Sequence, residues 1–421
     1  MGHGFLIAAP NSGSGKTTVA RGLMALFARK GYKVQPFKCG PDYIDTKFHA
    51  AVCGRPSINL DTFMATPEHV RELFDRYGAD ADMRVVEGMM GLFDGYDRDR
   101  GSSAEIARVL DLPVVLVVDA RSAAYSMAAL LSGFIHFRDD VHICGVIFNK
   151  VGSTRHYEML REVCDDLGIA CLGYLPKHSA MEQHSRYLGL DFSEEAGTSE
   201  LTEQLEAHVD WERMLALCGT NAEGHDWPAP LADAESGRQE RRLVVARNAE
   251  SFSFVYQEAL DRFAEVVTFD PERTTPPLEP GDLLYLPGGY PEKHLPALVA
   301  NESARRTIKA FAEDGGSVVA ECGGMMYLCQ RIITDDGTYP MCGVLPYSIT
   351  ARTADRKLSL GYRRFVLDGK EYRGHEFHYT QFAGDAPESI AQVYNAKGIP
   401  VPTPIFRYKN VLASYTHLYP L

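Results

Sequence analysis

Residues 5–18 read Phe-Leu-Ile-Ala-Ala-Pro-Asn-Ser-Gly-Ser-Gly-Lys-Thr-Thr, an apolar run that leads into a turn rich in glycine and serine. The apolar run is typical of a buried strand, and the pattern after the turn is typical of a helix. Backbone N–H groups in such a turn, and at the start of such a helix, bind phosphate. Gly15, Lys16 and Thr17 match the phosphate-binding pattern, whereas Pro10 occupies the position of its first glycine. The flanking strand and helix still favour a phosphate-binding loop over a turn without a ligand.

We expect this loop to bind ATP, with the Lys16 ammonium near the outer phosphates and the Thr17 hydroxyl bound to Mg²⁺. Asn149, at the end of a later predicted strand, is a candidate for contact with the nucleobase, although a plain turn role fits it equally well. The predicted nucleotide-binding residues are Ser12, Gly13, Ser14, Gly15, Lys16, Thr17, Thr18 and Asn149.

Carboxylates follow the next predicted strands of the first half. Asp42 and Asp45 come after the second strand, Glu87 ends the third, and Asp94 lies shortly after it. Because the carboxyl ends of parallel strands meet at one edge of a sheet, we expect them near the phosphate loop. Oxygen ligands suit Mg²⁺, and we predict that Thr17, Asp45 and Glu87 hold it. For each carboxylate alone, capping of a turn is the alternative.

Strands and helices alternate through the first half of the chain, which predicts a parallel, doubly wound α/β sheet. The predicted strands are 5–9, 33–38, 84–87, 113–119 and 143–149, and the predicted helices are 17–29, 67–77, 104–110, 155–167 and 199–217. Residues 219–241 are poor in large apolar side chains and predict a linker. We therefore expect domains at 1–218 and 242–421.

A second alternation begins after the predicted linker. Its predicted strands are 243–246, 265–269, 282–286 and 316–320, its predicted helices are 254–263, 303–313 and 325–330, and 341–391 and 405–415 favour β structure. Cys322 falls in the turn between the strand 316–320 and the helix that follows it, in the sequence Ala-Glu-Cys-Gly-Gly. A strand–turn–helix elbow exposes a nucleophile, and helix N–H groups favour its thiolate. We therefore predict a nucleophilic cysteine rather than an inert buried one.

A cysteine nucleophile needs a base and donors for the oxyanion. His417, after the final predicted strand, is the best candidate base, with His375 and His378 as competitors that could instead occupy a packed loop. The expected oxyanion donors are backbone N–H groups of Gly288 and Gly289, which follow a strand, and of Gly323.

The composition of the 421 residues is that of a globular protein, with 45% hydrophobic and 24% charged residues. A formal charge of −13 argues against a nucleic-acid partner. No apolar run is long enough for a membrane span. Nine cysteines without a Cys-x-x-Cys pair, and a first strand almost at the N-terminus, favour a reduced, cytoplasmic protein.

The combined motifs resemble the cobyrinate a,c-diamide synthase family of class I glutamine amidotransferases. The most specific stretches are 40–45, 86–95, 287–292, 320–328, 359–363 and 374–379. The resemblance implies a domain similar to dethiobiotin synthetase, in which Mg-ATP converts a tetrapyrrole acetate to an acyl phosphate. It also implies a flavodoxin-like glutaminase domain, in which Cys322 and His417 release ammonia from glutamine for amidation at positions a and c.

Further site residues are expected from the resemblance. The residues predicted at the substrate or acyl-phosphate site are Asp42, Tyr43 and Asp94. The candidates for binding the macrocycle are Tyr43, Asn59, Asp61, Arg363 and residues 374–379. The partners implied are small molecules, with a homodimer possible.

Two positions depart from related patterns. Thr46 stands where the family usually has proline. Class I glutaminases often place glutamate two residues after the catalytic histidine, and Tyr419 occupies that position here. The cobyrinate branch generally lacks that glutamate, so another group has to orient His417.

Two alternatives stay open on the sequence alone. The same machinery could act on another tetrapyrrole, such as nickel-sirohydrochlorin, sirohaem or hydrogenobyrinate. A P-loop ATPase switch with a degenerate glutaminase-like scaffold is the rival from another class, although an intact Cys322 and His417 speak against it.

Overall fold

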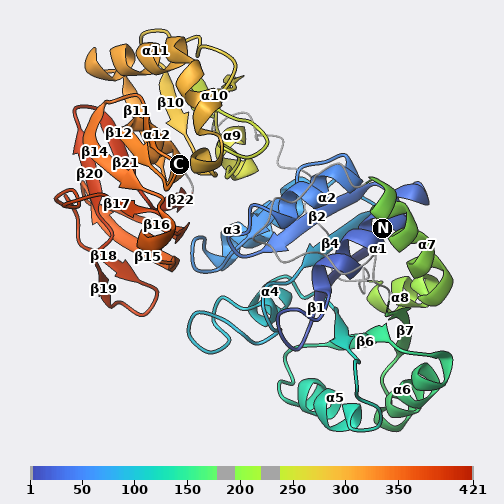
Figure 1. The fold of residues 1–421 in the computed structure, drawn as a ribbon. Helices are drawn as coiled ribbons and strands as arrows, with labels where there is room; N and C mark the ends of the chain where they lie inside the picture. Colours follow the sequence, from blue (N-terminus) through green and yellow to red (C-terminus); the bar gives the residue numbers. More distant parts are fainter. Residues whose placement is uncertain (1–2, 178–194, 220–237, 420–421) are drawn as a thin grey trace. The chain divides into compact units, whose positions relative to one another are not determined.

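A computed structural model describes residues 3–177, 195–219 and 238–419 (Figure 1). The chain divides into two compact units, Met1–Leu231 and Ala232–Leu421. Most of the predicted linker, 219–241, lies outside the described residues. No helix among the described residues is long and apolar enough to cross a membrane.

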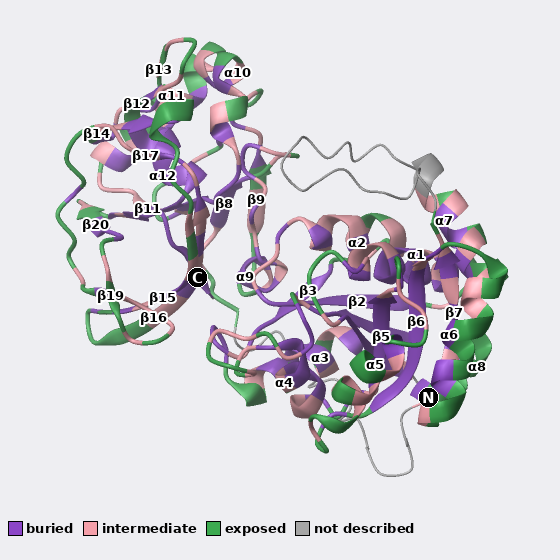
Figure 2. Cartoon of the chain, turned by 60° about the horizontal axis from the view of Figure 1, so that its bottom comes forward, coloured by how far each residue is buried: buried purple, intermediate pink, exposed green. Residues whose placement is uncertain are grey.

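The first unit is built on a seven-stranded parallel sheet in the order β3-β2-β4-β1-β5-β6-β7. Its strands are β1 (His3–Ala8), β2 (Val34–Cys39), β3 (Ile58–Leu60), β4 (Met83–Glu87), β5 (Val114–Asp119), β6 (Ile143–Val151) and β7 (Cys171–Pro176). The central strands are buried along almost their whole length, as Figure 2 shows for β2, β5 and β6. Such continuous apolar runs are typical of a parallel sheet covered on both faces.

Eight helices are described in this unit. They are α1 (Lys16–Arg29), α2 (Asp45–Cys53), α3 (Pro67–Gly78), α4 (Ser103–Val109), α5 (Met127–His136), α6 (Thr154–Leu167), α7 (Glu195–His208) and α8 (Trp211–Cys218). Side chains of Thr66, Ser102 and Ser153 accept backbone N–H bonds and so fix the starts of α3, α4 and α6. The predicted helix 199–217 is two helices, because Asp210 caps a new helix at Trp211.

The second unit has a six-stranded sheet in the order β20-β21-β11-β10-β8-β9, parallel except for the β20–β21 pair. Its strands are β8 (Leu243–Ala246), β9 (Val266–Phe269), β10 (Leu283–Leu286), β11 (Ser317–Glu321), β20 (Ile405–Tyr408) and β21 (Val411–Ser414). The α-helices are α9 (Gln257–Asp261), α10 (Leu295–Ala300), α11 (Glu302–Glu313) and α12 (Gly323–Leu328), with 3₁₀ turns η2 (Pro291–Lys293) and η3 (Thr353–Asp355). The fold class is therefore α/β in both units, as the sequence predicts.

Two predicted helices of this unit have different bounds. The helix predicted at 254–263 is only Gln257–Asp261, because Ser253 and Phe254 donate backbone bonds to the Gly288 carbonyl instead. The helix predicted at 325–330 begins at Gly323 and ends at Leu328, since the chain then enters β12.

Two smaller sheets account for the β-rich remainder. The first has the order β13-β12-β14-β17 and the second the order β19-β18-β15-β16-β22. Their strands are β12 (Cys329–Ile333), β13 (Thr338–Pro340), β14 (Leu345–Thr350), β15 (Ser359–Leu367), β16 (Lys370–His378), β17 (Gln381–Phe382), β18 (Val393–Asn395), β19 (Pro400–Val401) and β22 (His417–Tyr419).

Candidate functional site

The predicted phosphate loop joins β1 to α1 in the first unit. Gly15 caps the start of α1 with φ +96°, and Gly13 has φ +81°, both in the region that favours glycine. A Cβ on Gly15 would lie 2.0 Å from Nδ2 of Asn149, so a larger residue could not occupy this turn. The Lys16 ammonium, nearly buried, donates to the Met90 carbonyl. The loop therefore has a backbone conformation that depends on glycine, which is what an anion-binding loop requires.

Asn149 contacts the loop itself. Its Nδ2 donates to the Ser14 carbonyl at 2.9 Å, and its Oδ1 accepts from the Lys150 N–H at 2.9 Å. These bonds connect the end of β6 to the phosphate loop and hold the loop in place. Contact with a nucleobase stays a prediction for this residue.

The three predicted magnesium ligands lie together, Glu87 at the end of β4, Thr17 in the first turn of α1 and Asp45 at the start of α2. Oγ1 of Thr17 lies 2.6 Å from Oε1 of Glu87 and 3.4 Å from Oδ2 of Asp45. Lys38, which the sequence prediction missed, joins the two carboxylates: its Nζ is 2.7 Å from Asp45 Oδ2 and 2.8 Å from Glu87 Oε1. The pairing of β2 with β4 sets Lys38 directly opposite Glu87.

Charges in this cluster compensate one another. Burial alone would raise the pKa of Glu87, but the Lys38 ammonium and the His49 ring, 2.6 Å from Oε2, hold it well below its usual range. Burial likewise opposes the charge on Lys38, and the Asp45 and Glu87 carboxylates raise its pKa. Lys38 and Glu87 are therefore charged at neutral pH.

The oxygen atoms of this cluster fit a magnesium ion. A hydroxyl and two carboxylates are the ligand types that Mg²⁺ takes beside phosphates, and they converge within hydrogen-bonding distance. The Lys38 ammonium contacts the same two carboxylate oxygens and has to shift if they bind a cation. Among the described residues, His, Cys, Asp and Glu side chains form no group of three arranged to hold a metal, and the set predicted here combines two carboxylates with the Thr17 hydroxyl.

Asp42 and Asp94 bind the backbone of their own turns. Oδ1 of Asp42 accepts from the N–H groups of Ile44 and Asp45 at 2.8 and 2.9 Å, and Oδ2 of Asp94 accepts from the Gly91 N–H at 3.0 Å. These are the contacts expected of carboxylates that cap turns, the alternative to a functional role for each of them. Tyr43, beside Asp42, is largely buried. A role at the substrate or acyl phosphate stays a prediction for all three.

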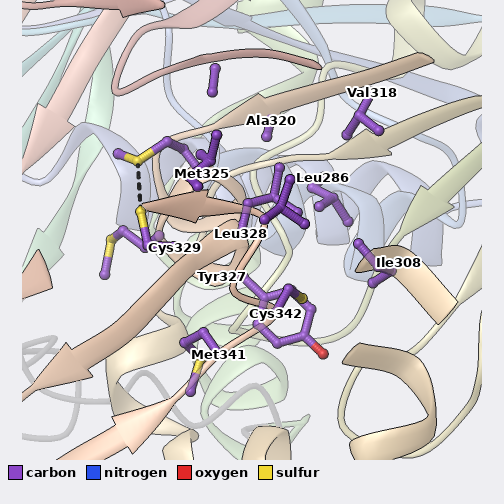
Figure 3. Packing of buried hydrophobic residues seen from close by; sticks show 14 of the residues in the cluster. Leu286, Ile308, Val318, Ala320, Met325, Tyr327, Leu328, Cys329, Met341 and Cys342 are labelled. Atoms are coloured by element: carbon purple, nitrogen blue, oxygen red, sulfur yellow. Dashed lines mark hydrogen bonds between the residues drawn. The ribbon is translucent and has the colours of Figure 1, made fainter. Parts of the chain in front are cut away.

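In the second unit, Cys322 lies between β11 and α12 with φ +47° and ψ −110°, a conformation that a non-glycine residue seldom adopts. Its N–H donates to the Ser414 carbonyl at 2.8 Å, so strand pairing continues into the turn. Every residue of α12 is buried, and Figure 3 shows Met325, Tyr327 and Leu328 of this helix packed among other buried hydrophobic residues. The strain is thus held by packing, as at other sharply presented nucleophiles.

The three glycines predicted as oxyanion donors lie around the same turn. A Cβ on Gly323 would lie 3.1 Å from the backbone nitrogen of Gly289, so these two backbones are in close contact. A Cβ on Gly288 would lie 2.1 Å from Cε1 of His417, which places the imidazole ring against this glycine. The β10–β11 pairing brings both loops to one edge of the sheet. The structure therefore brings Gly288, Gly289, Gly323 and His417 together.

Burial and negative charge keep the Cys322 thiol protonated. Burial raises its pKa, the charges of Glu292 and Glu376 raise it further, and only the Gly323 N–H opposes them. Burial also lowers the pKa of His417 to about 3. The resting pair is therefore a neutral thiol and a neutral imidazole, which is a state that can transfer a proton once substrate binds.

His378, a competing candidate for the base, has partners at both ring nitrogens. His378 donates from Nδ1 to the Thr380 carbonyl at 2.8 Å, its Nε2 lies 2.7 Å from Oε1 of Glu376, and its ring stacks on Tyr415. Both its nitrogens are thus engaged. His375 lies opposite His417 in the β16–β22 pairing.

A buried ion cluster adjoins the cysteine and was not predicted. Glu376 binds Arg363, His378 and, at 2.7 Å, the Thr403 hydroxyl, and Sγ of Cys322 lies 4.0 Å from the carbonyl of Phe377. Burial opposes ionisation of Glu376, but His378 and Arg363 lower its pKa to about 2. Arg363 is thus placed as a structural partner of Glu376 in the second unit.

Comparison with protein families matches both units. Residues 5–188 match the CobQ/CobB/MinD/ParA nucleotide binding domain, and residues 244–420 match the CobB/CobQ-like glutamine amidotransferase domain.

Similar proteins match almost the full length. The hydrogenobyrinate a,c-diamide synthase of Mycobacterium tuberculosis is 39% identical over 98% of this chain and 94% of its own. The hydrogenobyrinate a,c-diamide synthase of Brucella abortus is 40% identical over 99% of this chain and 98% of its own. The cobyrinate a,c-diamide synthase of Caldanaerobacter subterraneus is 38% identical over 98% of this chain and 94% of its own. These matches span both units.

Proposed function

Because the chain belongs to the cobyrinate and hydrogenobyrinate a,c-diamide synthase family, we propose that it amidates the a and c carboxylates of cobyrinate or of its metal-free form. The general chemistry is that of an ATP-dependent, glutamine-hydrolysing amidoligase. The observation that supports the substrate is the match over 98% of the chain to relatives whose names give only these two substrates.

We assign the synthetase reaction to the first unit. A carboxylate oxygen of the substrate attacks the γ-phosphorus of ATP, the bond to the β,γ-bridging oxygen breaks, and an acyl phosphate and ADP result. Lys16 and the loop N–H groups balance the phosphate charge, and Lys38 lies close enough to the same region to contribute. Thr17, Asp45 and Glu87 would hold Mg²⁺, which neutralises charge on the phosphates when bound.

We assign glutamine hydrolysis to the second unit. The Cys322 thiol gives its proton to His417, and the sulfur attacks the carboxamide carbon of glutamine. Backbone N–H groups of Gly288, Gly289 and Gly323 are the proposed donors to the oxyanion, a role that the proximity of these three turns supports. When the tetrahedral intermediate collapses, the C–N bond breaks, ammonia leaves with the proton from His417, and water then hydrolyses the thioester to glutamate.

The two reactions combine at the acyl phosphate. Ammonia attacks its carbonyl carbon, phosphate leaves, and an amide forms, once at each of two positions. Phosphorylation is needed because a carboxylate oxygen is a poor leaving group. Un-ionised ammonia is the nucleophile, and the glutaminase reaction delivers nitrogen in that form.

Mass spectrometry tests the substrate proposal. Purified enzyme receives Mg-ATP and glutamine with cobyrinate, hydrogenobyrinate, nickel-sirohydrochlorin or sirohaem in parallel reactions. We expect a diamide from cobyrinate or hydrogenobyrinate, and the faster of the two identifies the preferred macrocycle. Amidation of only nickel-sirohydrochlorin or sirohaem would overturn the substrate, and ATP hydrolysis without any amidation would favour the ATPase switch.

Three further properties are proposals. We expect Mg²⁺ to be required, so EDTA should stop synthesis and added Mg²⁺ should restore it. A homodimer is open to test by light scattering of the purified protein. A cytoplasmic location is supported by nine cysteines that all lie in described residues and form no disulfide.

A further inference from the structure

Glu321, immediately before the cysteine, lies beside His417. It ends β11 and is almost completely buried, with a 2% exposed residue surface. Its Oε2 lies 3.9 Å from Nδ1 of His417, a distance typical of an ion pair rather than of a direct hydrogen bond. The base and this carboxylate are therefore neighbours, although 96 positions separate them in the sequence.

Two hydrogen bonds fix the Glu321 carboxylate in that position. Oε1 accepts from the backbone N–H of Leu418 at 3.0 Å, and Oε2 accepts from the hydroxyl of Tyr285 at 2.7 Å. Leu418 directly follows His417 in β22, so the first bond anchors the strand that carries the imidazole. The second comes from β10, the strand that leads to Gly288 and Gly289.

Other acidic groups nearby have different partners. Tyr419, at the position where related glutaminases often have glutamate, donates its hydroxyl to Glu258. Glu376 is bound to Arg363, His378 and Thr403. Among these three glutamates, Glu321 is the one whose carboxylate lies within ion-pair distance of the His417 ring.

We propose that Glu321 is the positioning residue of His417, supplying from the cysteine's own strand the carboxylate that related enzymes place two residues after the histidine. This inference rests on the proposed roles of Cys322 and His417. Glu321 acts in its carboxylate form, which is the minor form at neutral pH and arises by loss of its proton to solvent. The carboxylate faces Nδ1–H, which leaves Nε2 to accept the proton from the Cys322 thiol. The imidazolium that forms then has a counter-charge beside it.

Electrostatics support this pairing. Burial raises the pKa of Glu321 to about 8, opposed by the Leu418 and Tyr285 donors, and lowers that of His417 to about 3. Each group is therefore costly to ionise alone, and the 3.9 Å between them is short enough for a charge on one to favour the opposite charge on the other. The groups that shift the pKa of His417 are His375 and His378, which lower it, and Glu376, which raises it, all on β16.

Steady-state kinetics of full-length Glu321→Gln test the proposal. Glutamine keeps the size, and its single carbonyl oxygen can accept from the Leu418 N–H while its NH₂ group donates to the Tyr285 hydroxyl oxygen, but it has no charge for the imidazolium. We expect kcat for glutamine hydrolysis to fall at least about 100-fold with KM nearly unchanged, since loss of the equivalent carboxylate in serine proteases lowers kcat by about 10⁴. Synthesis from added ammonium should continue at the wild-type rate.

Two further variants separate positioning from folding. Glu321→Asp restores the charge and should recover part of the lost kcat. Glu258→Gln alters a similarly buried carboxylate that binds Tyr419 and should keep glutaminase activity within a few-fold of wild type.

The outcomes are distinct. Glutaminase activity of Glu321→Gln within a few-fold of wild type would overturn the positioning role, as would equal losses in Glu321→Asp and Glu321→Gln. Loss of ammonia-dependent synthesis in Glu321→Gln would show a general structural defect and also contradict it. Absence of glutaminase activity in the wild-type protein would instead contradict the proposed function.

Discussion

Glu87 and Glu321 each end a central strand of a parallel sheet, and each is buried beside a proposed reacting group, yet their surroundings differ. Glu87 lies against the Lys38 ammonium and His49, so it is ionised. Glu321 accepts from a backbone N–H and a tyrosine hydroxyl, and burial raises its pKa to about 8. The first unit thus holds permanent charges where phosphates are handled. The second keeps its reacting groups neutral until a proton moves.

The largest effect that follows from this contrast is at the cysteine. We expect Cys322→Ala to lower glutamine-dependent amidation by at least about 10⁴-fold, because the sulfur that forms the thioester is lost. Ammonia-dependent amidation should remain, since the charges of the first unit are untouched. Parallel assays with glutamine and with ammonium chloride measure both. Loss of both activities in a folded variant would contradict the assignment of separate reactions.

Removing a carboxylate from the first unit should give the reverse pattern. We expect Asp45→Asn or Glu87→Gln to lower amidation roughly 10²- to 10³-fold while substantial glutamine hydrolysis remains, because the charge that faces magnesium and Lys38 is reduced. Glu206→Gln, which removes a surface partner of Arg29 and Lys30, is the matched control. Full amidation activity in either site variant would contradict the assignment of that residue to the metal site.

The charge balance around Lys38 also predicts a stability effect. Lys38→Met leaves Asp45 and Glu87 buried without their shared ammonium, and we expect the free energy of unfolding to fall by about 3 kcal/mol. Lys30→Met, at a partly exposed position, should change it by less than about 1 kcal/mol. Denaturant unfolding monitored by circular dichroism measures both variants. Equal stabilities would show that Lys38 does not compensate these carboxylates.

A smaller, pH-dependent effect distinguishes the two glutamates. Because the folded-state pKa of Glu321 is raised to about 8, the unfolded chain releases its proton first as pH rises from about 4. The free energy of unfolding of the wild type should therefore fall between about pH 5 and 8, by on the order of 1 kcal/mol or more. That of Glu321→Gln should not show this fall.

Glu87 should behave in the opposite way. Its pKa is lowered in the folded state, so its contribution is present above the unfolded pKa and is lost as pH falls through the folded one. Unfolding curves at several pH values for wild type, Glu321→Gln and Glu87→Gln measure both slopes. Parallel pH dependence in the wild type and Glu321→Gln would contradict the difference between the sites.

Local sequence signals predicted most of the fold that positions these sites. The apolar strand before Ser12 and the elbow at Cys322 are encoded by neighbouring residues, and the structure has a strand, turn and helix at both. Short elements were missed: β3 has three residues, too few for a periodic pattern. The predicted helix 254–263 was too long because Phe254 pairs with Gly288, a partner distant in sequence.

Lys38 and Glu321 could not be predicted as partners of Glu87 and His417, because the contacts that define these roles join residues distant in sequence. Lys38 reads as the end of a strand, and only the register of β2 against β4 sets it opposite Glu87. Glu321 reads as a residue next to the cysteine, whereas its bond to Leu418 spans 97 positions. His-x-Tyr at 417–419 indicated that the usual carboxylate was missing but not where a substitute lay.

Transfer of labelled nitrogen tests the central claim most directly. The enzyme receives Mg-ATP, cobyrinate or hydrogenobyrinate, and glutamine labelled with ¹⁵N in its side-chain amide, and the product is analysed by mass spectrometry. The account predicts a diamide in which both new amides carry the label, and with Cys322→Ala a labelled diamide only when ¹⁵N-ammonium replaces glutamine. A wild-type product without label, or labelled product from Cys322→Ala with glutamine, would contradict the account.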